Sequence, residues 1–429
     1  MPALVLFGLT AVLLWSLVSR RLEKWGVAGP ALLLVLGAAT TVWDLPAYGA
    51  AIDSPLTEKI VEVILSLLLF ADATEVRGGF FGGEGKVTAR LVLIALPIAL
   101  ILTTLASVLL MPESVVVAGI IACVALPTDF APAAQLLRTK RLPERIRAIL
   151  NVESGYNDGL VSPLFGIMLP IAVVVTPLVQ HTVQGEMSLS VSDNDLEHAA
   201  EKAVEAFFNA VPATLSAIAI GMVLGGIVGF VMRHARDRDI ASEGGARFTM
   251  LLLPLITYGI AVIPAIDANG FVAAFVAGLI YRVTRTNGMQ QRVIPHAELL
   301  LVEEVGTLTA NFVWYMLGGA ALLAFSISFD WRVLVLALLA LTLLRLGPVY
   351  LSLMRSSVSR ADRVKIGLLG PRGTATIVFG LLAYNALPET EGNIVLLVMV
   401  MTVVGSIVLH GVVSPILLRR FERADAAED

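Results

Sequence analysis

Charged side chains are scarce in this chain. Asp, Glu, Lys and Arg make up 15% of its 429 residues, whereas a soluble protein of average composition carries about a quarter. Hydrophobic residues make up 57%, so we expect lipid to surround the folded chain and membrane lipids to be its partners. The formal net charge of −4, with no basic run interleaved with aromatics, gives no indication of a nucleic-acid partner.

Cysteine is nearly absent as well. Cys123 is the single cysteine, which excludes an intrachain disulfide and a cysteine-based metal cluster. The N-terminal apolar run 2–18 is followed by Arg20, Arg21 and Lys24, whereas a signal peptide carries its positive charge before the apolar run. We interpret the run as a first membrane span whose N-terminus lies outside.

Long apolar runs are the main positive feature of the sequence. A transmembrane helix needs about 20 mainly apolar residues, and on that criterion we predict an all-α, polytopic membrane protein with thirteen spans. Their approximate bounds are 2–19, 26–43, 57–75, 88–111, 113–138, 144–178, 205–232, 247–264, 269–282, 295–325, 330–353, 363–385 and 391–418.

The basic residues alternate between the loops that join these spans. Lys59, Lys202 and Arg332 fall in loops that we place outside, Arg345 and Arg372 fall within spans, and all other Lys and Arg fall in inner loops. Such a bias is what the positive-inside rule requires. We therefore expect a multi-pass protein of the cell membrane with its C-terminus in the cytoplasm.

The order of the spans predicts an inverted repeat. Residues 1–178 form a first six-helix repeat with core helices at about 88–178, and 179–246 form an outer loop and a linker helix. Residues 247–418 form a second repeat of opposite orientation with core helices at about 295–385, and 419–429 form a cytoplasmic tail. Inverted repeats are common among secondary transporters.

Two of these spans carry helix breakers in corresponding positions of the two halves. The fifth span has Thr128 and Asp129 between Pro127 and Pro132, and the twelfth has three glycines and a proline within 367–373. Proline inside a helix removes a hydrogen bond and clashes with the preceding turn. Interrupted helices in matching positions indicate a transporter's binding site, although two proline kinks held by neighbouring helices remain the structural alternative.

The sixth span concentrates polar side chains in the middle of the membrane. Residues four apart share a helix face, so Ser154 lies beside Asp158 and Glu153 lies beside Asn157. A charged side chain at the bilayer centre costs about 2.5–3.5 kcal/mol on insertion scales, and by default it indicates an ion or proton path.

Several of these charges also have a structural interpretation. Glu153 and Arg345 of the eleventh span would neutralise each other as a buried pair, which is the reading that we favour for both. Arg372 would either offset the dipoles of the broken helices or take part in transport directly. Asp72 and Glu75 of the third span would be either interfacial acids or part of the site.

Hard cations prefer oxygen ligands. Asp129, Asp158, Thr128, Ser154 and the carbonyls freed near Pro127 supply such ligands. Loss of hydration favours the neutral form of a carboxylic acid, so one oxygen would hold either a proton or a cation. The charges of Asp129, Glu153, Asp158, Arg345 and Arg372, with Asp72 and Glu75 left out, sum to −1, which favours one proton or one monovalent cation in each cycle.

With these residues the chain resembles the cation:proton antiporter-1 family, the bacterial sodium/proton antiporters related to animal sodium/proton exchangers. The likeness extends over the whole chain. It includes Phe70-Ala71-Asp72-Ala73, Thr128-Asp129, Glu153-Ser154, Asn157-Asp158, Asn269-Gly270-Phe271, Arg345 and Arg372-Gly373.

The resemblance implies a role for each of these positions. Asp158 would be the main carrier of cation and proton, with Asp129, Thr128, Ser154, Asn157 and Asp72 in the same cation- and proton-binding group. Glu153 and Arg345 would form a structural ion pair, and Arg372 would be the charge beside the unwound helices. These roles imply an exchanger without a resident cofactor.

The resemblance also implies how the protein works. Asn157, where electrogenic relatives have a second Asp, implies electroneutral one-for-one exchange. The fifth and twelfth spans would cross at their unwound centres. The family acts as homodimers, by an elevator-like movement of a core domain against a dimerisation domain.

The sequence departs from the family pattern at two places. Phe130 follows Asp129, where the usual pattern has proline, and Gly155 and Tyr156 replace the more usual apolar pair before Asn157. Both changes can alter the shape of the site and with it the preference for sodium or potassium.

The sequence thus predicts an antiporter that exchanges sodium for protons in pH and cation homeostasis, with potassium and lithium as further candidate ions. A potassium/proton antiporter is the alternative of the same class, and a channel or ion sensor on the same scaffold is an alternative of a third class. An intramembrane aspartyl protease is the alternative of another class. It lacks support because Tyr156-Asn157-Asp158 only approaches the Tyr-Asp pattern and no Gly-x-Gly-Asp occurs.

Overall fold

The computed structural model describes residues 2–25, 27–76, 80–81, 83–111, 114–130, 142–183, 193–289, 293–327 and 329–413. These residues form helices and connecting turns, without a strand, so the all-α fold is confirmed. The helices are α1 (Pro2–Lys24), α2 (Gly29–Thr41), α3 (Leu45–Ile52), α4 (Pro55–Glu75), α5 (Gly85–Arg90), η1 (Leu91–Ala95), α6 (Leu96–Leu110), α7 (Val115–Ala125), α9 (Glu144–Val183), α10 (Asp193–Asp237), α11 (Glu243–Ala261), α12 (Gly270–Arg285), α13 (His296–Ile327), α14 (Trp331–Leu341), α15 (Leu343–Ser352), α16 (Arg360–Leu368), α17 (Thr374–Ala386), α18 (Glu389–Val408) and η3 (Leu409–Val413).

Each predicted span coincides with one or more of these helices, but the count of thirteen is not confirmed. Within the described ranges eight helices are long and apolar enough to cross a membrane, or nine if α2 and α3, which are bent by 117° at their junction, count as one span. Helices α7, α12 and α17 are too short for this criterion. Helix α4 has the length, but it carries Glu58, Lys59, Glu62, Asp72 and Glu75.

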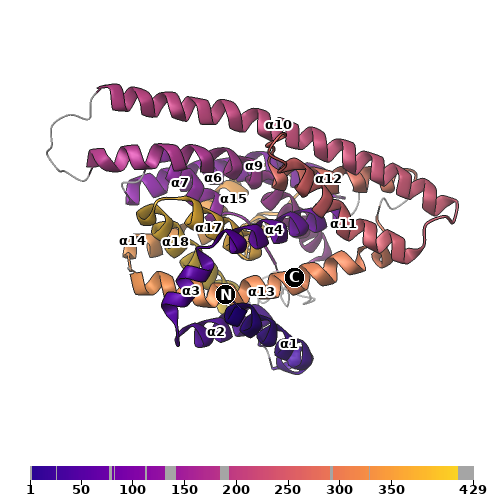
Figure 1. Cartoon of the computed structure of the whole chain (residues 1–429). Coiled ribbons are helices and arrows are strands. Elements are labelled where there is room, and N and C mark those ends of the chain that lie inside the picture. Colours follow the sequence, from indigo (N-terminus) through magenta and orange to yellow (C-terminus); the bar gives the residue numbers. More distant parts are fainter. Residues whose placement is uncertain are drawn as a thin grey trace.

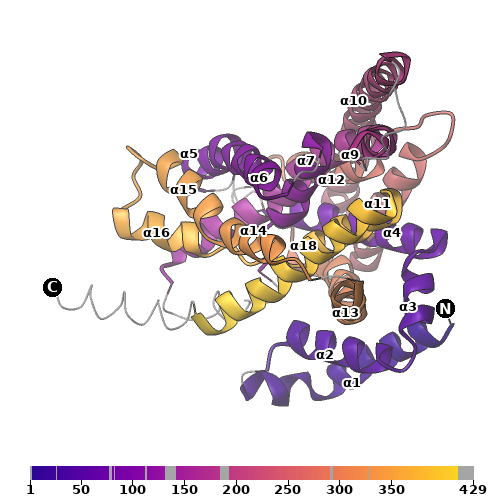
Figure 2. The same ribbon diagram turned by 90° about the vertical axis from the view of Figure 1, so that its left-hand side faces the viewer.

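The long helices α9, α10 and α13 run in the same general direction across the molecule (Figure 1). Helix α10 lies along one edge and packs on α9 and α12, whereas α1 and α2 lie at the opposite edge against α13. Figure 2 shows the same separation after a quarter turn. Helix α4 occupies the middle, since it packs against α9, α12, α13 and α17.

The most deeply buried helices are those next to the two breaks. All residues of Val117–Ala125 in α7 are buried, as are the first ten residues of α17. Ser114 is the N-cap of α7, and its side chain accepts a hydrogen bond from the Val117 N–H. The helix ends two residues before Pro127. Helix α16 ends at Leu368, just before Gly370 and Pro371.

Two unwound segments result. We call residues 126–130 the α7 link and residues 369–373 the α16–α17 link; both are non-helical. A third break separates α14 from α15 at Thr342. Pro132 and the tail 419–429 lie outside the described residues, and the boundaries of the repeats and their core helices stay predictions.

Candidate functional site

Three predicted aspartates and Glu75 line one cavity. Its volume is about 630 Å³, and Asp72 on α4, Asp129 on the α7 link and Asp158 on α9 all contribute to its wall. The cavity continues to Glu23 and to His296, whose side chain is 77% exposed. Because these two residues lie at the predicted inner ends of their spans, the cavity opens toward the side that we expect to be cytoplasmic.

Asp158 lies at the buried end of this cavity. Only 4% of the residue is exposed, and its Oδ1 atom has no hydrogen-bond partner among the described residues. An unpaired polar atom in the interior costs about 1–3 kcal/mol. A bound proton or cation would remove that cost, which is the property expected of a carrier.

The two links cross at Asp129. Its N–H donates a hydrogen bond to the Pro371 carbonyl at 2.8 Å. Its Oδ2 atom accepts hydrogen bonds from the N–H and the hydroxyl of Thr374, at 2.9 and 2.6 Å. A Cβ atom at Gly373 would overlap this carboxylate, so glycine allows the close approach. The carboxylate of Asp129 therefore caps the N-terminus of α17.

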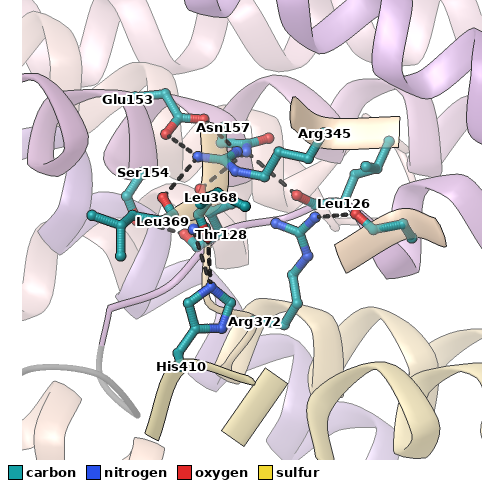
Figure 3. A network of polar contacts seen from close by, with 12 residues as sticks. Leu126, Thr128, Glu153, Ser154, Asn157, Arg345, Leu368, Leu369, Arg372 and His410 are labelled. Atoms are coloured by element: carbon teal, nitrogen blue, oxygen red, sulfur yellow. Dashed lines mark hydrogen bonds and ion pairs between the residues drawn. The ribbon is translucent and has the colours of Figure 1, made fainter. Parts of the chain in front are cut away.

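Thr128, Ser154 and Asn157 tie α9 to the α7 link. The Asn157 Nδ2 donates to the Thr128 Oγ1 at 3.1 Å, and the Ser154 hydroxyl donates to the Thr128 carbonyl (Figure 3). These three described residues do not line the cavity. The structure thus places them beside the aspartates, and the buried Oδ1 atom of Asn157 has no hydrogen-bond partner among the described residues.

Glu153 and Arg345 form a bidentate ion pair. Nη1 and Nη2 of Arg345 each lie 3.0 Å from a carboxylate oxygen of Glu153. Both residues are 5% exposed, and Nη2 also donates to the Leu369 carbonyl in the α16–α17 link at 3.1 Å (Figure 3). Neither residue lines the cavity. Their geometry is that of a structural pair that ties α9 and α15 to the link.

Arg372 is fully buried in the α16–α17 link. Its Nη2 donates to the Ala340 carbonyl at 3.1 Å, and Ala340 lies in the last turn of α14. A cation beside the C-terminal carbonyls of a helix offsets the negative end of the helix dipole. The two roles considered for Arg372 at the broken helices both stay predictions.

The departures Gly155 and Tyr156 lie on the face of α9 that meets α4 and α12. A Cβ atom at Gly155 would stand 3.1 Å from the Asp72 carbonyl oxygen, so glycine lets α9 approach α4 closely. The Tyr156 hydroxyl donates to the Phe80 carbonyl and lies 3.2 Å from Nη2 of Arg282 on α12. Neither residue lines the cavity.

Sequence reasoning missed several residues at this crossing. Thr374, Ser406 and His410 all bond to the links or to Asp129. A threonine directly after Arg372-Gly373 is a typical helix-start residue, which is a usable signal for Thr374. A histidine inside the apolar last span is costly unless it is bonded, and this cost was the available signal for His410.

Chemically, the cavity offers carboxylate oxygens to a small hard cation at the end of a solvent-connected space. The described residues contain no group of three or more His, Cys, Asp or Glu with the spacing of a resident metal site. Carboxylate oxygens in such a position can bind a small hard cation or take up a proton.

Comparisons with known proteins show similarity to sodium/proton antiporters. The family model described as "Sodium/hydrogen exchanger, transmembrane" matches residues 8–420. A Na(+)/H(+) antiporter of Schizosaccharomyces pombe is 24% identical over 357 residues, which cover 78% of this chain and 68% of that protein.

Two solved structures have a similar fold. Both are of the sodium proton antiporter MjNhaP1 from Methanocaldococcus jannaschii. The structure at pH 8 gives a TM-score of 0.69 with 20% identity, covering 95% of this chain and 98% of the other. The electron-microscopy structure gives 0.69 with 19% identity, covering 98% of each chain.

Proposed function

Because this chain belongs to the sodium/hydrogen exchanger family of transmembrane proteins, we propose that it exchanges sodium for protons by alternating access, one for one. The family consists of transporters, so the chain is a multi-pass membrane protein and not an enzyme. Membership in this family excludes the aspartyl-protease alternative. The observation that carries the proposal is the convergence of Asp72, Asp129 and Asp158 on one cavity that opens to one side.

Asp158 is the proposed carrier. Its Oδ1 atom is buried and has no hydrogen-bond partner among the described residues. Either a proton or a sodium ion would therefore stabilise this oxygen. The two cannot occupy the same oxygen together. Asp129, which Thr374 holds in place, and Asp72 contribute further oxygens to the same cavity.

A second cavity supports access from the opposite side. It has a volume of about 210 Å³ and is lined by Glu58 and Glu62 of α4, together with residues of α9, α11, α12 and α17. Glu62 and Asp72 are ten residues apart on α4, or about 15 Å along the helix axis. Phe165, which lines this second cavity, packs against Phe379 of α17 with ring centroids 4.7 Å apart. We propose that this contact belongs to the closed outer barrier.

Electroneutral exchange is the proposed stoichiometry. The amide of Asn157 cannot carry a charge, and it is bonded to the α7 link rather than directed into the cavity. Glu153 is neutralised by Arg345. Of the three aspartates in the cavity, Asp158 is then the one that we propose exchanges one proton for one monovalent cation, while Asp72 and Asp129 keep their protonation states through the cycle.

Further features of the assembly, ion preference and membrane orientation belong to the same proposal. The protein acts as a homodimer, and its core helices move against a scaffold in an elevator-like manner. Potassium and lithium compete with sodium to some degree, with potassium/proton exchange as the alternative function. The N-terminus lies outside and the C-terminus in the cytoplasm of the cell membrane, where exchange serves pH and cation homeostasis.

Reconstitution tests the proposal. Purified protein is placed in liposomes that contain a pH-sensitive dye, and sodium, potassium or lithium is added in turn. We expect saturable proton movement with sodium, coupled uphill to an imposed gradient. A larger response to potassium would favour the potassium/proton alternative, whereas unsaturable flux that cannot be coupled uphill would indicate a channel.

A further inference from the structure

The α16–α17 link breaks a helix in the interior, so its backbone groups need partners from elsewhere. The Leu369 carbonyl accepts from Arg345 at 3.1 Å, and the Pro371 carbonyl accepts from the Asp129 N–H at 2.8 Å. These two contacts come from α15 and the α7 link. The contacts on the other side of the link come from the last span of the chain, which the proposed mechanism does not use.

His410 and Ser406 supply that other side. Nε2 of His410 lies 3.1 Å from the Leu368 carbonyl and 3.3 Å from the Gly370 nitrogen (Figure 3). The Ser406 hydroxyl oxygen accepts from the Arg372 N–H at 2.7 Å. His410 is 1% exposed and Ser406 is fully buried, so these bonds do not compete with bulk water.

The other ring nitrogen of His410 binds its own helix. Nδ1 lies 3.0 Å from the Ser406 carbonyl oxygen and 3.2 Å from the Ser406 hydroxyl. Both ring nitrogens are therefore engaged, with Nε2 on the link and Nδ1 on the end of α18. The imidazole bridges the unwound segment and the last span.

A neutral imidazole satisfies this geometry in two ways. With the proton on Nε2, the ring donates to Leu368, and Nδ1 accepts from the Ser406 hydroxyl, which itself accepts from Arg372. With the proton on Nδ1, the ring donates to the Ser406 carbonyl, and Nε2 accepts from the Gly370 N–H. Each arrangement ties the link to α18, so the bridge does not require a change of charge on the ring.

We propose that His410, with Ser406, is a positioning residue that fixes the α16–α17 link and thereby the cation site. The link leads directly into Thr374, whose N–H and hydroxyl hold the Asp129 carboxylate, while Pro371 holds the Asp129 N–H. A shift of the link therefore moves Asp129 relative to Asp158. The inference rests on the proposed exchange function, since it concerns the binding of the transported cation.

Four variants test the bridge. His410→Leu keeps the bulk of the ring and removes both polar contacts, whereas His410→Gln keeps one donor and one acceptor near the position of Nε2. Ser406→Ala removes the acceptor for the Arg372 N–H. His234→Leu is the matched control, because Nδ1 of His234 makes the same contact to a carbonyl four residues earlier, at 2.9 Å, away from the links.

The measurement is sodium-driven proton movement in liposomes, with the half-saturating sodium concentration and the maximal rate determined separately. We expect His410→Leu to raise the half-saturating concentration about tenfold, which corresponds to 1.4 kcal/mol. Ser406→Ala raises it to a smaller extent. His410→Gln stays within about twofold of the unmodified protein with the same pH profile, and His234→Leu changes neither quantity.

Two results would overturn the inference. The first is a His410→Leu protein that unfolds at a lower temperature yet keeps its half-saturating sodium concentration, because the histidine would then be merely structural. The second is a displaced pH profile in His410→Gln, which would make the ring a titrating group. If His410→Leu does not fold, the half-saturating sodium concentrations of Ser406→Ala and His410→Gln decide. A higher value in Ser406→Ala than in His410→Gln supports the inference, and equal values contradict it. Absence of exchange in the unmodified protein would instead contradict the proposed function.

Discussion

Asp129 caps the N-terminus of α17 at Thr374: its Oδ2 atom accepts hydrogen bonds from both the N–H and the hydroxyl of Thr374, at 2.9 and 2.6 Å. The contact joins two segments that are 245 positions apart in the sequence. Since Asp129 also lines the cavity with Asp158, the two broken helices and the cation site form one structural unit. We therefore expect a structural change in either link to alter cation binding at the site.

Replacement of Thr374 by valine removes the hydroxyl and keeps the backbone N–H. The loss of one hydrogen bond costs about 1 kcal/mol, so we expect the half-saturating sodium concentration to rise about fivefold. Transport assays in liposomes measure this change. Thr374→Ser, which restores the hydroxyl, serves as the control, and a valine variant indistinguishable from it would show that the contact does not position Asp129.

The pair of Glu153 and Arg345 predicts a loss of stability. Arg345→Ala leaves Glu153 buried without its partner, so we expect the free energy of unfolding to fall by about 3–5 kcal/mol. The ratio of sodium to potassium transport in surviving protein stays unchanged, because neither residue lines the cavity. Thermal unfolding of the purified protein checks the first quantity.

An exposed pair provides the matched control for this prediction. Arg145 contacts Glu84 with two bonds of 2.8 and 2.9 Å, but the two side chains are 42% and 34% exposed. Arg145→Ala should cost about 0–1 kcal/mol. If Arg345→Ala and Arg145→Ala lowered the free energy of unfolding equally, burial of the ion pair would not explain the role of Arg345.

Tyr156 is expected to affect packing rather than ion preference. Tyr156→Phe removes the hydroxyl that bonds to the Phe80 carbonyl and to Arg282, and it keeps the ring that packs against Phe275. We expect a loss of stability of about 1 kcal/mol and an unchanged ratio of sodium to potassium transport. A changed ratio would show that this departure from the family pattern shapes the site.

One-for-one exchange predicts insensitivity to voltage. If one proton and one sodium ion cross in opposite directions, no net charge moves, so an imposed membrane potential performs no work on the cycle. Proton movement in liposomes with a potassium diffusion potential tests this, with lithium or sodium as the transported ion. A rate that rises or falls steeply with the potential would contradict electroneutrality.

The sequence predicted the fold and much of the crossing because both depend on local patterns. Apolar runs and breakers identify spans and unwound segments, and Pro127 and Gly370-Pro371 lie at the two links. The number of spans was harder to predict from the sequence. Helix α4 carries several charges that packing against α9, α12 and α13 accommodates, and such tertiary contacts leave no periodic signal.

The partners within the site were harder to predict, because they depend on contacts between distant segments. The hydrogen bonds that Ser154 and Asn157 make to Thr128 across α9 and the α7 link were not predicted, and a cation-binding role for these three residues stays a prediction. Thr374 and His410 were not singled out, since a threonine or a histidine in an apolar run has many possible partners. Only the fold shows which of these partners is within reach.

The most direct test of the central claim is the dependence of sodium-driven proton movement on pH, in the unmodified protein and in Asp158→Asn. If protons and sodium share the Asp158 carboxylate, the half-saturating sodium concentration rises as the pH falls while the maximal rate at saturating sodium is unchanged, and the folded Asp158→Asn protein is inactive. Full exchange by Asp158→Asn, or a half-saturating concentration that is independent of pH, would contradict the claim.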